Sequence, residues 1–347
     1  MIFNLIKIEL NMIYRYVLIF LIIFLISNLL IINFDTTSKI NTNVPQYMEI
    51  TMSNDNDIAN IINNHKNDKF VIWKKTSAGW GNRLMGMCKT VMFAIVFETK
   101  ILMDHDQYEA SFNDPETKVW FNQKPLLKKL YFKSVTYKSF IWNNDTQVTF
   151  IPQENFKVIP KEWLNILVNK GIIDKADTFE AFMKVGQFLT RYPSQKLIKE
   201  VKNMKATLNF PKIDTSVQIR TMKDYNPGHE IAMSEWKQKQ VWDCVNSAVK
   251  NGTFYFTSDE EKLFDTAKKN LKYVYSNRHG FEHTSHTNKL IPSSIIEWFL
   301  IGESDVVVCS GTSFCISAVS RRYDTISSIY FVKNSYKKPN VICQCIK

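Results

Sequence analysis

The sequence predicts an α/β fold in which two Rossmann-type domains face each other across a cleft. From residue 69 onward, short apolar runs typical of strands alternate with longer amphipathic runs, as in parallel sheets with crossover helices. The chain has 347 residues, which is enough for two ordinary domains. Its 45% hydrophobic and 22% charged residues, with only 10 Gly and 10 Pro, exclude collagen-like, disulfide-framework and disordered classes.

An apolar segment at residues 16–34 precedes the globular part. It carries no charge and is long enough to span the hydrocarbon core of a bilayer. Lys7 and Arg15 lie before it, and positive flanks stay cytoplasmic, so residues 1–15 are expected to be a cytoplasmic tail. A cleavable signal peptide is the alternative, but Asp-Thr-Thr at 35–37 is no cleavage site. The pattern favours a type II signal anchor.

Residues 35–68 are polar and rich in Asn and Asp, so we expect a stalk that buries no core. Two sequons, at Asn144 and Asn251, would be glycosylation sites in a lumenal compartment, although sequons also arise by chance. The formal charge of +11 is spread over lysines at helical spacings, which is typical of a solvated face. No nucleic-acid partner is expected.

The first domain is expected at residues 69–210 and the second at 211–347, with the boundary near 205–215. In the first domain the pattern predicts strands at 70–73 and 100–103 and helices at 84–97, near 125–131 and at 177–190. In the second it predicts strands at 216–220, 254–257, 273–275, 306–309 and 329–332, and helices at 234–251, 260–271, 292–302 and 314–321.

The first predicted strand leads into a glycine-containing turn at Gly79 and Gly81. Such a turn before a helix lets the backbone approach a phosphate, because a helix N-terminus offers N–H groups and positive potential. A dinucleotide fingerprint would need glycine where Leu84 stands, and a P-loop would need Lys-Ser/Thr directly after Gly86. An ordinary tight turn remains the alternative.

Three strand ends in the second domain carry groups that suit a phosphate. Arg220 closes one strand, where a guanidinium could clamp a diphosphate or form a surface ion pair with Asp224 or Glu230. Thr257-Ser258-Asp259 and Ser310-Gly311-Thr312-Ser313-Phe314 end two others. Their hydroxyl groups suit phosphate oxygens, and N-capping by Thr312 or Ser313 is the alternative.

Residues outside these motifs are also candidates for catalysis, metal binding and sugar binding. Asp104, His105 and Asp106 follow a strand and could supply a base or bind a metal, but a solvated loop is favoured. Trp80 and Trp298 are candidates for stacking on a sugar.

Of the six cysteines, Cys88 and Cys309 lie in apolar runs and are expected to be buried thiols. Cys343 or Cys345 can bridge to Cys244 or Cys315, and the sequence leaves this pairing open. Cys343 and Cys345 have no second Cys/His pair at the spacing of metal ligands, so no zinc site is expected.

Together the segments resemble the GDP-fucose-dependent fucosyltransferases, closest to the α1,2-fucosyltransferase group with its plant xyloglucan type. The matching segments are Gly79-Trp80-Gly81-Asn82-Arg83-Leu84 (Gly-x-Gly-Asn-Arg), Val217-Gln218-Ile219-Arg220 (the donor motif), Thr257-Ser258-Asp259 (Thr-x-Asp), and Glu297-Trp298 followed by Ser304 to Phe314. The resemblance covers roughly residues 69–332. Trp80 and Cys315 depart from the family's pattern.

The resemblance implies a GT-B fold and a Golgi membrane enzyme with a lumenal catalytic domain, a glycosyltransferase of the hexosyltransferase class. It implies inverting transfer of fucose from GDP-fucose to a glycan, α1,2 to galactose, with no cofactor or essential metal. Arg220 would be the catalytic residue that holds the diphosphate. The expected substrate-binding residues are Gly79, Gly81, Asn82, Arg83, Gln218, Ser258, Asp259, Ser310, Thr312, Ser313 and Phe314.

Two alternatives stay open. One is a protein O-fucosyltransferase or another GDP-sugar transferase with the same fold. The other is a stalked glycan-binding domain without catalysis.

Overall fold

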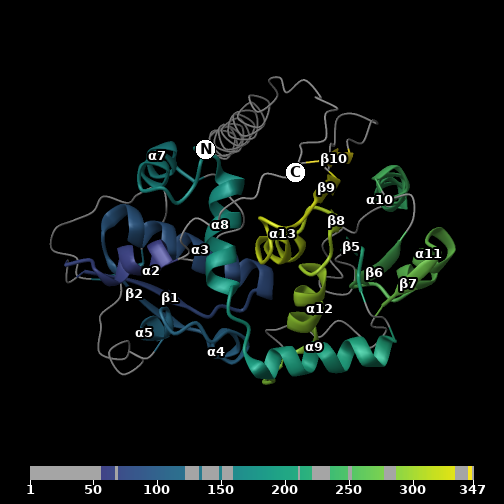
Figure 1. The fold of residues 1–347 in the computed structure, drawn as a ribbon, viewed down its shortest axis with the longest axis horizontal. Coiled ribbons are helices and arrows are strands. Elements are labelled where there is room, and N and C mark those ends of the chain that lie inside the picture. The colour runs from purple at the N-terminus through teal and green to yellow at the C-terminus, as the bar shows by residue number, and fades with distance from the viewer. Residues whose placement is uncertain are drawn as a thin grey trace, which may run out of the picture. The chain divides into compact units, whose positions relative to one another are not determined.

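Two parallel β-sheets with helices packed on them form the body of the protein (Figure 1). The computed structural model describes residues 56–66, 69–121, 133–134, 148–150, 159–209, 212–220, 235–248, 252–276, 287–332 and 343–345. All of them belong to one compact unit, Met52–Lys347.

The first sheet has the strand order β2-β1-β4-β3, and all its pairs are parallel. Its strands are β1 (Phe70–Lys74), β2 (Lys100–Asp104), β3 (Lys133–Ser134) and β4 (Val148–Phe150). The central residues of β1 and β2 are buried, as expected for strands covered on both faces. Helix α3 (Trp80–Phe97) connects these two strands as a crossover.

The second sheet has the order β10-β9-β8-β5-β6-β7 and is parallel except for β10 at its edge. Its strands are β5 (Thr215–Ile219), β6 (Thr253–Ser258), β7 (Tyr273–Tyr275), β8 (Val306–Cys309), β9 (Ser328–Val332) and β10 (Cys343–Cys345). The chain starts this sheet at β5, moves outward to β7, and returns to the other side of β5 with β8 and β9. This is the doubly wound nucleotide-binding order, and its direction reverses between β5 and β8.

The sequence pattern predicted some of the remaining helices and missed others. Those that match a predicted helix are α8 (Thr178–Thr190), α10 (Glu235–Ala248), α11 (Lys262–Asn270), α12 (Ser293–Ile301) and α13 (Ser313–Ser320). Helix α3 begins four residues before the predicted start at 84. The sequence pattern missed α2 (Asn56–Asn63), α4 (Asp106–Ser111), α5 (Lys118–Phe121), α7 (Lys161–Asn169) and α9 (Gln195–Leu208).

Helix α2 corrects the predicted stalk at its C-terminal end. Ile58, Ala59 and Ile62 are buried in the main core, and Asn63 Oδ1 accepts a hydrogen bond from Trp120 Nε1 at 2.9 Å. The Asn/Asp-rich composition concealed three apolar residues on one face of a short helix. Residues 56–63 therefore belong to the folded body.

One hydrophobic core joins the two sheets. It contains Val71 of β1, Leu84 of α3, Val307 of β8 and Ala318 of α13. Helix α13 packs on both α3 and α8, and Figure 1 shows it between α8 and β8. The other face of the second sheet has its own core, which includes Val217. The predicted division at 205–215 separates the two sheets in sequence and stays a prediction as a domain boundary.

Several predictions concern residues outside the described ranges. They are the tail at 1–15, the anchor at 16–34, most of the stalk, the helix near 125–131, and the sequons at Asn144 and Asn251. Within the described ranges, no helix combines the length and the apolar character that a membrane crossing requires.

A buried ion-pair cluster fixes the end of α8. Arg191 Nε donates to Asp114 Oδ2 at 3.0 Å and its Nη2 to Glu116 Oε2 at 2.5 Å. The side chains of Arg191 and Asp114 are 8% and 1% exposed. We expect Arg191→Met to lower the free energy of unfolding by about 3–5 kcal/mol, because it leaves the Asp114 carboxylate buried without its partner. Urea denaturation measures this change.

The matched control is Lys170→Met. The Lys170–Glu98 ion pair has a distance of 3.2 Å, but its side chains are 29% and 65% exposed. Its loss should change the free energy of unfolding by less than about 1 kcal/mol. Equal effects of the two substitutions would contradict the structural role of the Arg191 cluster.

Candidate functional site

The candidate site lies at the carboxyl edge of the second sheet, where β5 and β8 are neighbours. Arg220 follows β5 and Ser310 follows β8. In open α/β sheets, ligands bind outside the carboxyl ends of the strands at the point where the strand order reverses. The motif residues of both strands therefore lie at the position where this architecture binds ligands.

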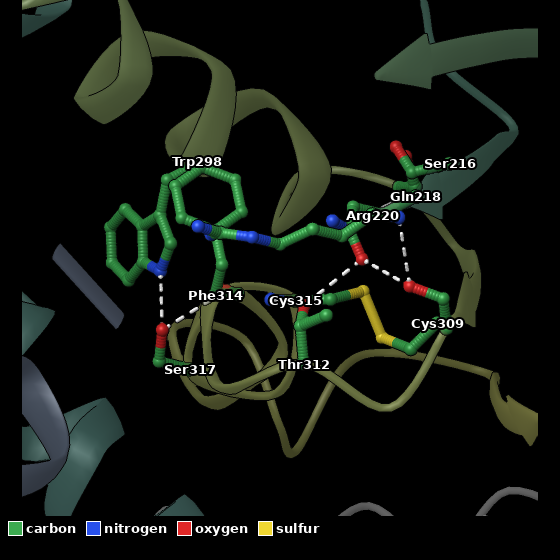
Figure 2. Close-up of a disulfide and its surroundings, with 11 residues drawn as sticks. Ser216, Gln218, Arg220, Trp298, Cys309, Thr312, Phe314, Cys315 and Ser317 are labelled. Carbon is green, nitrogen blue, oxygen red and sulfur yellow. Dashed lines mark hydrogen bonds between the residues drawn. A yellow bond between two sulfur atoms is a disulfide. The ribbon is translucent and has the colours of Figure 1, made fainter. Parts of the chain in front are cut away.

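A small hydrogen-bond network ties the two strand ends together (Figure 2). Gln218 Oε1 accepts hydrogen bonds from the hydroxyl groups of Ser310 and Thr312, both at 3.0 Å. Ser310 Oγ accepts from the backbone N–H of Arg220 at 3.1 Å. Thr312 Oγ1 accepts from the backbone N–H of Cys315 at 3.3 Å.

This network determines where the hydroxyl protons point. A hydroxyl group has one proton, and both backbone groups are donors, so Ser310 and Thr312 direct their protons at Gln218. In this arrangement their hydroxyl groups do not donate to a phosphate, contrary to the expectation from the sequence. Thr312 is instead the N-cap of α13, which the sequence left as the alternative.

The first turn of α13 adds a backbone donor at Ser313, whereas the N–H groups of Cys315 and Ile316 already donate to Thr312. The first N–H groups of a helix have no partner within the helix and carry partial positive charge. Gly311 leads into this turn with φ +78°, a left-handed conformation that suits glycine. Ser313 is half-buried and Phe314 buried at the start of the helix. This N-terminus is suited to bind an anion.

Arg220 forms an ion pair with Asp259, at 3.8 Å between Nε and Oδ2. The two side chains are 16% and 10% exposed. Asp224 and Glu230, the partners considered from the sequence, lie outside the described residues. In Figure 2 the Arg220 side chain points from the end of β5 toward Phe314. A guanidinium has five N–H donors, so a contact through Nε is compatible with a bidentate contact to a phosphate.

Gly81 brings the first half of the protein to this turn. A Cβ atom on Gly81 would lie 2.5 Å from Cα and N of Phe314 and from the carbonyl carbon of Ser313. Only glycine permits this approach of two backbones. Gly79 is the N-cap of α3, and Gly81 lies in its first turn. The N-termini of α3 and α13 therefore meet at the candidate site.

Asn82 and Arg83 lie in helix α3 rather than in a loop. Arg83 is 1% exposed, and its Nη1 donates to Gln107 Oε1 at 2.5 Å. Gln107 Nε2 donates in turn to the carbonyl oxygen of Lys289, at 3.1 Å. Arg83 is thus buried and bonded to Gln107 instead of reaching into a cleft, which corrects the expectation from the sequence. Asn82 is half-buried.

The third strand end contributes Ser258 and Asp259. Ser258 is buried, and its Oγ accepts a hydrogen bond from the N–H of Glu260 at 3.1 Å. Thr257 donates to the buried carboxylate of Glu297 at 2.9 Å, which links β6 to α12. Asp259 is the residue of this segment that contacts Arg220. The structure therefore brings the ends of β5, β6 and β8, which carry the predicted site residues, to one edge of the second sheet.

Trp80 and Trp298 are both core residues, 2% and 0% exposed. Their rings form an edge contact with centroids 5.7 Å apart, and Trp298 Nε1 donates to Ser317 Oγ of α13 at 2.8 Å. This corrects the expectation that they stack on a sugar. The two tryptophans instead link α3 to α13, and this packing holds Gly81 against Phe314.

The loop after β2 is only partly solvated. Asp106 is exposed and pairs with Lys75 at 2.9 Å. His105, in contrast, is 1% exposed and lies between the rings of Trp73 and Trp80. Burial lowers the pKa of His105 to about 4, which Asp106 only partly offsets. Among the described residues, no cluster of three His, Cys, Asp or Glu side chains could hold a metal ion.

Two features of the site were not predicted from the sequence. The pairing of Arg83 with Gln107 gives no sequence signal. The disulfide Cys309–Cys315 does, because two cysteines six residues apart enclose the Ser310–Phe314 turn. Cys309 is therefore not the thiol expected, whereas Cys88 is a buried free cysteine. Of the open pairings, Cys244–Cys343 forms.

No protein-family model matches the chain, and no curated protein sequence is similar to it. Comparison with solved structures finds a variant of Arabidopsis thaliana FUT1 in complex with GDP, with TM-score 0.49 and 12% identity over 81% of this chain and 74% of that one. It also finds the α-1,6-fucosyltransferase NodZ from Bradyrhizobium soaked with GDP-fucose, with TM-score 0.46 and 9% identity over 76% of this chain and 95% of that one. POFUT1 in complex with GDP follows, with TM-score 0.43 and 12% identity over 75% of this chain and 96% of that one. At these values the likenesses assign no activity, which has to come from the residues of this chain.

The buried His105 makes stability depend on pH. Its pKa is lowered in the folded protein from 6.5 to about 4, so folding favours the neutral ring, and stability falls as the pH drops through this window. Between pH 7 and pH 5 the loss amounts to about 2 kcal/mol. We expect His105→Leu to remove this part of the pH dependence.

Urea denaturation of both proteins at pH 7 and pH 5 measures the effect. The difference between the two pH values should be smaller in His105→Leu than in the unsubstituted protein. The same pH difference in both would show that His105 titrates normally in the folded state.

Proposed function

We propose that this chain is a glycosyltransferase that moves L-fucose from GDP-β-L-fucose to a hydroxyl group of a glycan acceptor, with inversion. One observation carries the proposal. Four motif segments that resemble fucosyltransferases, at 79–84, 217–220, 257–259 and 310–314, were expected on sequence grounds to share one site. They meet at the carboxyl edge of the second sheet, through Gly81 on Phe314, Gln218 on Ser310 and Arg220 on Asp259.

The chemistry of transfer requires stabilisation of the negative charge that develops on the departing GDP. Preorganised donors in a site with little water stabilise such charge most effectively. Arg220 is in place to do this, held by Asp259, together with the N-terminus of α13. We assign the diphosphate contact to these groups. The proposed reaction then uses positive groups of the chain itself, and no essential metal is required.

The linkage and the acceptor rest on the resemblance alone. We propose α1,2 transfer to galactose, with a protein O-fucosyltransferase or another GDP-sugar transferase as the second candidate. We further propose a Golgi enzyme of type II topology, supported by the apolar segment at 16–34 and its positive flank. A stalked glycan-binding domain without catalysis is the alternative from another class. The ordered pair Arg220–Asp259 favours the enzyme, because glycan binding alone has no use for a partly buried cation at an edge that suits a phosphate.

The test follows release of GDP from GDP-fucose by the full-length protein in detergent, with and without a galactose-terminated acceptor. Release that depends on the acceptor would support the fucosyltransferase. Release with a peptide acceptor only would favour the second candidate. No binding or turnover of any GDP-sugar would leave the glycan-binding domain.

Arg220→Ala should reduce kcat/KM by about 10²–10³-fold, because it removes a charged donor to the departing diphosphate. Arg220→Lys should recover only part of the activity, since an ammonium group cannot make two parallel hydrogen bonds. Steady-state kinetics with GDP-fucose measure both variants.

Arg322→Ala is the matched control, because it removes the same charge at the other end of α13. Arg322 Nε bonds to Thr325 there, at 3.0 Å. It should leave kcat/KM within a few-fold of the unsubstituted enzyme. Equal losses from Arg220→Ala and Arg322→Ala would contradict a specific role for Arg220.

A further inference from the structure

The disulfide Cys309–Cys315 encloses the turn at the candidate site. It joins the last residue of β8 to the third residue of α13, with a sequence separation of 6 and a Cα–Cα distance of 5.8 Å. Both cysteines are fully buried. Figure 2 shows the bridge beside Thr312 and Gln218. No residue of the proposed transfer chemistry is a cysteine, so this bridge needs a separate explanation.

The turn has to be held in one conformation for α13 to present its N–H groups. Gly311, which is exposed, lies in the turn with φ +78°, and glycine loses more conformational freedom than other residues when it is ordered. The Gln218 network holds the turn from the β5 side through Ser310 and Thr312. The disulfide closes it from the α13 side.

The second disulfide offers a contrast within the same chain. Cys244–Cys343 joins α10 to β10 across a sequence separation of 99 residues. A disulfide that closes a long loop restricts the unfolded chain more than one that closes a short loop. Cys309–Cys315 should therefore add less to global stability than Cys244–Cys343. Its main effect is local, on the geometry between β8 and the start of α13.

We propose that Cys309 and Cys315 are positioning residues, whose disulfide preorganises the Ser310–Phe314 turn so that the N-terminus of α13 and Arg220 face the diphosphate of the donor. This proposal rests on the proposed GDP-sugar specificity. Preorganisation raises affinity because ordering of the turn does not have to occur on binding. Without the bridge, the free energy of GDP binding has to supply that order.

The experiment compares two double variants of the full-length protein, C309A/C315A and the matched control C244A/C343A. Isothermal titration with GDP measures affinity, and thermal unfolding measures stability. We expect C309A/C315A to bind GDP about tenfold more weakly, the size of effect expected when a turn is no longer preorganised. C244A/C343A should bind GDP as tightly as the unsubstituted protein but should unfold at a lower temperature than C309A/C315A.

Guanosine separates positioning from general damage to the site. Guanosine lacks the diphosphate, so its affinity, measured by competition with GDP, should be the same in C309A/C315A and in the unsubstituted protein. Equal loss of guanosine and GDP affinity would overturn the proposal, and so would unchanged GDP affinity. If the unsubstituted protein binds no GDP, the proposed function fails first, and this outcome is distinct from the other two.

A second measurement applies if C309A/C315A does not fold. The C244A/C343A protein retains only the disulfide in question, and a phosphine can reduce it until alkylation and mass spectrometry show both thiols. GDP affinity should fall after reduction and recover after reoxidation. Equal affinity of the reduced and oxidised forms would overturn the proposal.

Discussion

The close approach of Gly81 to the backbone of Ser313 and Phe314 is the constraint on which the candidate site depends. Glycine is required because a Cβ atom would lie 2.5 Å from backbone atoms of the other helix. Trp80 turns into the core beside this contact and meets Trp298, which bonds to Ser317 of α13. Packing of two large aromatic rings thus holds two helix N-termini together, and their positive ends add at one place.

The second sheet supplies the charged group at the same place. Its doubly wound order puts the ends of β5 and β8 side by side, so Arg220 and the start of α13 are neighbours by topology. Gln218 accepts from the hydroxyl groups of Ser310 and Thr312, and Asp259 forms an ion pair with the guanidinium. The side chains of Gln218, Ser310, Thr312 and Asp259 thus fix positions, and Arg220 and the start of α13 are the groups that can meet an anion. Fixed donors of this kind need little rearrangement when charge develops.

The strands β1, β2 and β5 to β9 were predictable from sequence, whereas β3, β4, β10 and the side-chain partners were not. Every described strand from β5 to β9 lies within one residue of its prediction, because each has a short group of apolar residues bounded by polar ones. The common edge of 217–220, 257–259 and 310–314 followed from the strand ends, whereas the place of 79–84 beside them followed only from the resemblance. Arg83 was misplaced because a buried arginine with a distant partner such as Gln107 has no local pattern. Helix α2 was missed because its polar composition masked its buried face.

Hydrogen–deuterium exchange with and without GDP tests most directly whether the four segments form one nucleotide site. If they do, GDP slows exchange together in residues 79–84, 217–220, 257–259 and 310–316, while exchange around Lys170 is unchanged. Protection confined to one segment, or located only elsewhere in the chain, would contradict a single nucleotide site.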